Sequence, residues 1–149
     1  MTVIHKSALV PYSAAQMYRV INDIESYPEY LPWCRSSRVI SQTDREQVGE
    51  LEVARAGIRQ KFTTCNRLYP DRKIEIHLQD GPFSKLEGVW KLTELRPDAC
   101  KVELTLEFEF AGKLINSAFG RVFGQIAATL VDAFCKRLHE VYGGKGRSV

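Results

Sequence analysis

The chain has few of the residues that build metal and dithiol sites. Its three histidines belong to no HExxH motif and have no paired carboxylates beside them. Its four cysteines form no CxxC pair, which is typical of reduced, mostly buried thiols in a cytosolic protein. We therefore expect no metal site and only free thiols among these residues, which are His5, His77, His139, Cys34, Cys65, Cys100 and Cys135.

Long apolar runs and a strong excess of one charge are also missing. No stretch runs 18 apolar residues without a charge, and residues 1–10 lack the pattern of a secretory signal, so we expect neither a membrane span nor secretion. A net charge of +3 is small for a dedicated nucleic-acid-binding protein, so we expect no DNA partner. These absences predict a cytoplasmic protein, and they leave peripheral contact with the inner membrane open.

The composition that remains is that of a globular protein. With 149 residues, 44% of them hydrophobic, the chain is long enough to bury a core as one domain, residues 1–149. Residues Thr2–Val10 predict a first strand. Ser13 and Gln16 have capping-box spacing, so we expect a helix to begin there, with Tyr12 and Met17 as its hydrophobic staple.

Two helical signals and a long alternating segment follow. A second pair with capping-box spacing, Ser26 and Glu29, predicts a short helix that ends at Pro32. Residues Arg38–Ala111 alternate in hydrophobicity between turn signals, which predicts an antiparallel meander of about six strands. The clearest strand is Cys100–Phe110, with one apolar and one polar face.

The last segment, Lys113–Tyr142, has an apolar stripe at helical spacing and predicts one long amphipathic helix. The fold class is therefore α+β, with a curved antiparallel sheet of about seven strands around a long C-terminal helix and two short helices after the first strand.

Such a sheet and helix rarely fit along their whole length, so we expect an internal tunnel for a hydrophobic ligand, although the same residues also suit an ordinary core. The predicted lining is Tyr27, Tyr30, Leu31, Trp33, Phe62, Ile76, Phe83, Trp90, Leu106, Phe108, Phe119, Val122, Phe123, Ile126 and Leu130.

The polar faces of the strands suggest a second site. Basic side chains gather on and beside the predicted fourth strand, whereas the last strand is acidic, so we expect one half of the sheet to be basic and the other acidic. A basic face is suited to RNA contact, and the alternative is a solvated face paired across strands. The candidate RNA-binding residues are Arg55, Arg59, Lys61, Arg67 and Lys73.

Nearly the whole chain resembles the START-like coenzyme Q-binding and polyketide cyclase-like family. The resemblance is carried by ALVPYSAAQMYRVINDIESYPEYLPWC at Ala8–Cys34, DGPF at Asp80–Phe83, LEGVWKL at Leu86–Leu92, ELTLEFEF at Glu103–Phe110 and AFGRVF at Ala118–Phe123. It implies a helix-grip fold, with seven antiparallel strands around a C-terminal helix and a hydrophobic tunnel.

The same resemblance implies several functions. Our first expectation is a non-catalytic protein that binds ubiquinone or a similar lipid and supports respiration, with no required cofactor. The alternative is a toxin that binds the large ribosomal subunit and blocks subunit association and translation initiation, with an antitoxin protein as a possible partner. A second alternative is an oligoketide cyclase. We assign no catalytic residue, and Cys34 is the only nucleophile considered.

Overall fold

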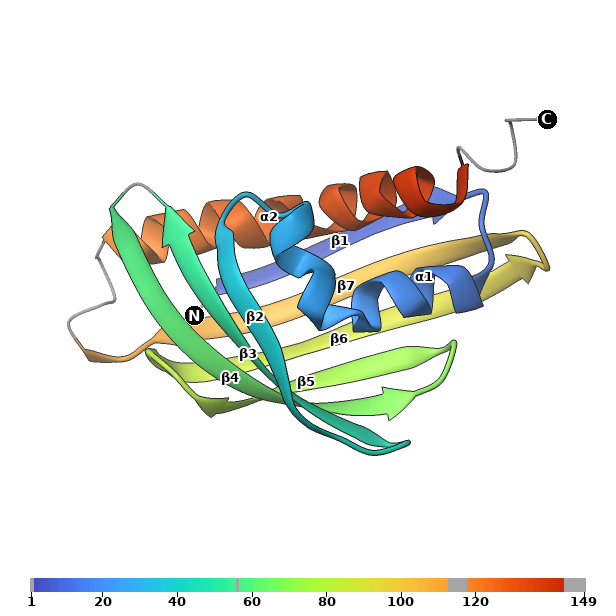
Figure 1. Cartoon of the computed structure of the whole chain (residues 1–149). Coiled ribbons are helices and arrows are strands. Elements are labelled where there is room, and N and C mark those ends of the chain that lie inside the picture. The colour runs from blue at the N-terminus through green and yellow to red at the C-terminus, as the bar shows by residue number, and fades with distance from the viewer. Residues whose placement is uncertain (1, 56, 113–117, 144–149) are drawn as a thin grey trace.

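A seven-stranded antiparallel sheet wraps around one long helix. The computed structural model describes residues 2–55, 57–112 and 118–143. The spatial order of the strands is β1-β7-β6-β5-β4-β3-β2, and helix α2 (Ala118–Leu138) runs along the concave side of the sheet (Figure 1). The strands are β1 (Thr2–Val10), β2 (Cys34–Gln42), β3 (Glu46–Arg55), β4 (Ile58–Tyr69), β5 (Lys73–Asp80), β6 (Phe83–Arg96) and β7 (Ala99–Phe110). The predicted fold class is confirmed.

Helix α1 (Ala14–Asn22) begins at the predicted capping box. The Ser13 hydroxyl accepts a hydrogen bond from the Gln16 backbone amide at 3.1 Å, and the Gln16 side-chain oxygen accepts one from the Ser13 amide at 3.0 Å. Two of the free amides at the helix start are thereby satisfied. Met17 and Ile21 are buried on the face that meets the core.

The second short helix differs from its prediction. It is a 3-10 helix, η1 (Ile24–Glu29), so it starts before Ser26 and ends before Pro32. The Ser26 hydroxyl donates to the Asp23 carboxylate at 2.6 Å and does not cap a helix. The carbonyl of Tyr27 accepts from the amides of Tyr30 and Leu31, which ends the helix in a tight turn.

The strands follow the predicted alternation. Val102, Leu104 and Phe108 on β7 are almost fully buried, and the residues between them are more exposed. The first strand of the meander begins at Cys34 and not at Arg38. The turn between β3 and β4 contains Gly57 with a φ of 80°, and the sequence analysis found no turn signal there.

The C-terminal helix carries the predicted apolar stripe. Phe119, Ile126, Phe134 and Leu138 are buried against the sheet. The helix ends in a π-helical turn, η3 (His139–Gly143), and the predicted helix start at 113–117 lies outside the described residues. Residues 118–143 are long and apolar enough to cross a membrane by length and composition, but in this fold they include the central helix of the core.

Candidate functional site

A cavity of about 100 Å³ lies between the sheet and α2. Both tryptophans of the chain line it. From the predicted lining it contains Tyr27, Trp33, Phe62, Ile76, Trp90, Leu106, Phe123, Ile126 and Leu130. Its walls come from η1, β3 to β7 and α2, so segments far apart in the sequence converge on one space.

The other predicted lining residues are not among those that border this cavity. Several of them belong to a cluster of phenylalanines that pack edge to face between the first half of α2 and the sheet. The Phe83 ring centroid lies 4.9 Å from that of Phe123, and the Phe108 centroid lies 5.0 Å from Phe123. The residues outside the cavity lining are Tyr30, Leu31, Phe83, Phe108, Phe119 and Val122.

Sequence reasoning missed several lining residues. Leu51, Thr64 and Leu86 could have been found, because their positions on the concave face follow from strand parity. No feature of the sequence marked Gly49 as a lining residue. A Cβ at Gly49 would lie 2.7 Å from Cδ1 of Ile24, so glycine allows η1 to lie close to β3. The missed set is Ile24, Gly49, Leu51, Thr64, Asn66, Leu86 and Phe134.

Polar side chains interrupt this apolar lining at β4. Asn66 is only 6% exposed, and its Oδ1 has no hydrogen-bond partner among the described residues. Gln47 lies opposite Asn66 in the β3–β4 register and is 2% exposed. The Gln47 amide nitrogen donates to the Asn22 carbonyl at 3.0 Å and to Gln42 Oε1 at 3.3 Å. Both of its hydrogens are therefore used elsewhere.

Aromatic residues of η1 and α2 close the cavity on one side. The Tyr27 hydroxyl donates to the Ile21 carbonyl, and the Tyr27 ring centroid lies 5.3 Å from that of Phe134. Burial, with smaller contributions from Tyr30 and other neighbours, raises the pKa of Tyr27 well above its ordinary value. The Tyr27 hydroxyl is therefore neutral at physiological pH, and Tyr27 adds no charge to the cavity lining.

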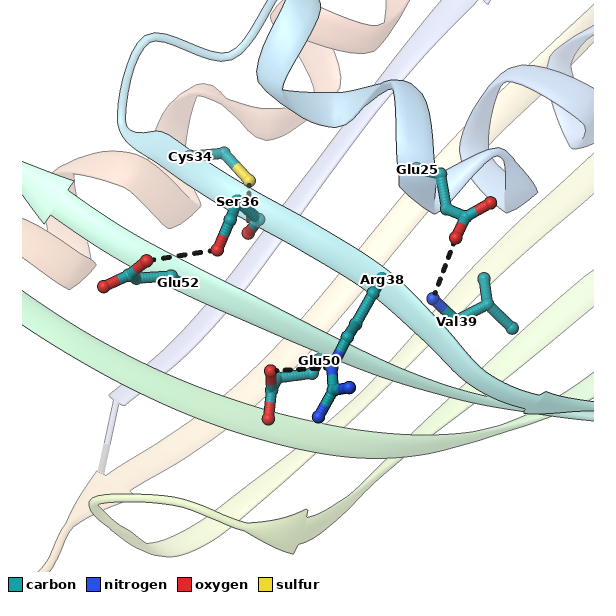
Figure 2. Close-up of polar contacts among 7 residues, drawn as sticks. All are labelled: Glu25, Cys34, Ser36, Arg38, Val39, Glu50 and Glu52. Atoms are coloured by element: carbon teal, nitrogen blue, oxygen red, sulfur yellow. Dashed lines mark hydrogen bonds and ion pairs between the residues drawn. The ribbon is translucent and has the colours of Figure 1, made fainter.

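Cys34 does not have the surroundings of a nucleophile. Its thiol donates to the Ser36 carbonyl at 3.4 Å (Figure 2), and burial, helped by the charge of Glu52, raises the thiol pKa to about 11. A reactive cysteine needs a lowered pKa. Cys34 and Cys100 are buried, as predicted, but Cys65 and Cys135 are only partly buried.

The predicted basic residues separate into two groups on the sheet. Arg55, Arg59 and Lys61 lie around the β3–β4 hairpin, where Ala54 pairs with Arg59 and Glu52 with Lys61. Arg35, which sequence reasoning missed, joins them because its Nε lies 3.9 Å from Glu52 Oε1. Arg35, Arg55, Arg59 and Lys61 are exposed, and we call them the hairpin basic cluster. Glu52, 3.3 Å from Arg59 Nε, is the carboxylate paired with it.

The remaining pair, Arg67 and Lys73, lies near the opposite end of β4. Arg67 is eight residues from Arg59, or about 26 Å along an extended strand. It pairs in register with Glu46 and Glu75, and Lys73 Nζ lies 3.3 Å from Glu75 Oε2. The turns at the two ends of β3 lie far apart in Figure 1.

The predicted division of the sheet into a basic and an acidic half is not complete, because ion pairs join neighbouring strands in both halves. Figure 2 shows Arg38 of β2 beside Glu50 of β3, with Nε and Oε1 3.1 Å apart. On the other side of the sheet, Lys85 Nζ lies 3.0 Å from Glu107 Oε2. Both halves therefore carry mixed charge, and the hairpin basic cluster is a local excess of positive charge.

Comparisons with known proteins identify the family. A model of the family described as polyketide cyclase/dehydrase and lipid transport matches residues 10–135. The chain belongs to this family. Within it, the chain is 48% identical over 145 residues to the ribosome association toxin RatA of Escherichia coli K12, covering 97% of this chain and 92% of that protein.

Two further matches are more distant in sequence. The mitochondrial coenzyme Q-binding protein COQ10 homolog B of Xenopus laevis is 28% identical over 142 residues, covering 93% of this chain and 58% of that protein. The crystal structure of the ZhuI aromatase/cyclase from Streptomyces sp. R1128 has a TM-score of 0.81 at 18% identity, covering 96% of this chain and 97% of that chain. The latter likeness shows the START-like fold.

Proposed function

We propose that this protein binds the large ribosomal subunit and blocks its association with the small subunit. The similarity to RatA, at 48% identity over 97% of the chain, carries this proposal. The name of that relative refers to ribosome association, whereas the relative named for coenzyme Q binding is only 28% identical. This role therefore replaces ubiquinone binding as our leading interpretation.

The hairpin basic cluster supports the proposal, because it holds four exposed cations: Glu52 is ion-paired with Arg35 and Arg59 and lies opposite Lys61 in register, and Arg55 is the last residue of β3. Contacts to an RNA backbone are made mainly by lysine and arginine and weaken as salt rises. The sheet elsewhere carries cross-strand ion pairs such as Lys85–Glu107. We expect the hairpin, and not the β6–β7 side, to face ribosomal RNA.

Sucrose-gradient sedimentation of purified subunits tests this function. Adding the protein to small and large subunits in magnesium buffer should reduce the peak of associated ribosomes, and the protein should sediment with the large subunit. Unchanged subunit association at saturating protein would contradict the proposal. Lysozyme, a basic protein of similar size, is a control for non-specific effects of positive charge.

Hydrophobic-ligand binding is a second candidate function, and the apolar cavity favours it. An apolar cavity of roughly 150 Å³ is known to hold benzene. The cavity here, at about 100 Å³, is smaller, so a ubiquinone head group and isoprenoid tail would need η1 and α2 to separate. Mass spectrometry of lipid extracted from the purified protein tests this role, and a lipid-free extract would count against it.

We propose that the protein acts by binding and not by catalysis. Among the described residues that line the cavity there is no cysteine, histidine or charged side chain, so a nucleophile with an adjacent base is not assembled there. A cyclase that only shapes its substrate would also need a larger space than about 100 Å³. Incubation with a reactive polyketide chain tests the cyclase alternative. A cyclase would change the distribution of cyclised products from that formed without the protein.

A further inference from the structure

We propose that the cavity binds a small neutral ligand carrying a hydroxyl or N–H donor, which donates a hydrogen bond to Oδ1 of Asn66. This proposal rests on the hydrophobic-ligand function and is independent of ribosome binding. It specifies the ligand's chemistry: an apolar ring or short chain with one donor group, of which a phenol is the simplest example.

The unsatisfied oxygen of Asn66 is the first observation. Asn66 lines the cavity, is 6% exposed, and has no partner for Oδ1 among the described residues. A buried acceptor that loses water without gaining a partner destabilises the folded state. Such a group at the wall of a cavity is therefore satisfied best by whatever occupies that cavity.

Two polar side chains close to Asn66 or to the cavity have other partners. Gln47, opposite Asn66 in register, uses its amide hydrogens on Asn22 and Gln42. Tyr27, on the η1 side of the cavity, donates its hydroxyl hydrogen to the Ile21 carbonyl. Neither side chain supplies a donor to Asn66, and we infer that the missing donor belongs to a ligand in the cavity.

The rest of the lining limits the ligand to a neutral, largely apolar molecule. Trp33, Phe62, Trp90 and Leu106 surround the space, and no charged side chain is among the described lining residues. A charged ligand would lose its hydration without an opposite charge to compensate. A quinone ring has only acceptor oxygens, so it cannot donate a hydrogen bond to Oδ1, whereas a hydroquinone or phenol can.

Size and lining together favour an aromatic ring. A volume of about 100 Å³ is below the roughly 150 Å³ of a cavity that accommodates benzene, so a single ring fits only after a small expansion. Bulkier ring systems would require larger movements. Phenol and toluene are therefore suitable probes, because they have nearly the same shape and only phenol has a donor.

The test compares the affinities of phenol and toluene for the purified full chain by NMR. The indole N–H signals of Trp33 and Trp90 report occupancy directly, because both rings line the cavity. We expect the wild type to bind phenol about tenfold more tightly than toluene, the size of effect that one buried hydrogen bond produces. In Asn66→Leu, which keeps the branched shape but is bulkier and apolar, both probes should bind more weakly and the order should reverse, since an apolar cavity prefers toluene.

Leu106→Met is the matched control, because it alters the lining without changing its polarity. It should keep the preference for phenol even if both probes bind more weakly. Toluene binding as tightly as phenol to the wild type would overturn the role of Asn66 and leave ligand binding intact. Failure of both probes to bind the wild type would overturn both this inference and ligand binding in the cavity. The wild-type comparison decides the question even if Asn66→Leu does not fold.

Discussion

Arg137, near the end of α2, joins that helix to η1 through Glu29, with Nη2 3.3 Å from Oε1. The Arg137 guanidinium also lies 4.7 Å from the centroid of the Tyr30 ring. These contacts hold together the two elements whose aromatic residues Tyr27 and Phe134 close the cavity. Arg137 therefore fixes η1 against α2 beside the cavity.

The two partners of this contact should contribute unequally to stability. Glu29→Gln should lower the free energy of unfolding by only about 0.5 kcal/mol, because the Glu29 side chain is 63% exposed. Arg137→Met should cost about 1 kcal/mol more, since it also loses the cation–π contact with Tyr30 and leaves Glu29 unpaired. Urea denaturation measures both, and equal losses would contradict this division.

The capping box makes a separate prediction about α1. Ser13→Ala should lower the free energy of unfolding by about 1 kcal/mol, because the Gln16 amide loses its acceptor at the helix start. Ser7→Ala, at an exposed site on β1, is the control and should change stability by less than about 0.5 kcal/mol. Thermal unfolding followed by circular dichroism compares the two. A loss in Ser7→Ala as large as that in Ser13→Ala would contradict the assignment.

Asn66 should reduce stability when the cavity is empty. Replacing it by leucine removes an unsatisfied buried acceptor, so Asn66→Leu should raise the free energy of unfolding by about 1 kcal/mol. Asn66→Asp should lower it, because a buried carboxylate would lose its hydration. Denaturant unfolding of ligand-free protein measures both changes. A clear loss of stability in Asn66→Leu would mean that the amide oxygen has a native partner.

The buried thiols predict a loss of stability at alkaline pH. Burial, with contributions from Glu52 and Asp132, raises the pKa values of Cys34 and Cys135 from about 9 to about 11. Between these pH values the unfolded chain has released both protons while the folded chain keeps them. The unfolded state binds fewer protons there, so the free energy of unfolding falls as pH rises from 9 to 11.

Melting temperatures measured across this pH range test the prediction. The double variant Cys34→Ala/Cys135→Ala should be less stable at neutral pH because it loses buried volume. Its melting temperature should nevertheless fall less steeply with pH than that of the wild type. A decline of equal slope in both proteins would show that other groups, such as Tyr27 or Tyr30, cause it.

Local sequence signals predicted the fold well, because they act over short distances. The Ser13–Gln16 box and the alternation on β7 depend only on neighbours in the chain, and the structure confirms both. The start of η1 was predicted wrongly, because the Ser26 hydroxyl donates a hydrogen bond to the Asp23 carboxylate and does not cap a helix amide. Asp23 and Glu29 each lie three residues from Ser26, and this spacing alone does not show which of them the hydroxyl contacts.

The site was harder to predict, because it depends on how distant segments pack. Burial distinguishes core from surface, but it does not show that Phe83 and Phe108 fill their space while Trp90 borders a cavity. The hairpin basic cluster likewise requires the register that brings Arg35 of β2 to Glu52 of β3. The sequence pattern does not show the register in which strands pair.

Binding of purified large ribosomal subunits at increasing salt is the most direct test of the proposed function. The variant Arg55→Gln/Arg59→Gln/Lys61→Gln removes three charges from the hairpin basic cluster, and Arg35 and Ser36 remain beside Glu52. The control, Lys91→Gln/Arg96→Gln/Lys101→Gln, removes the same charge from β6 and β7. We expect wild type and control to bind tightly at low salt and to weaken as salt rises, and the hairpin variant to bind about tenfold or more weakly with a shallower salt dependence. Equal affinity of the hairpin variant and the control would contradict the account.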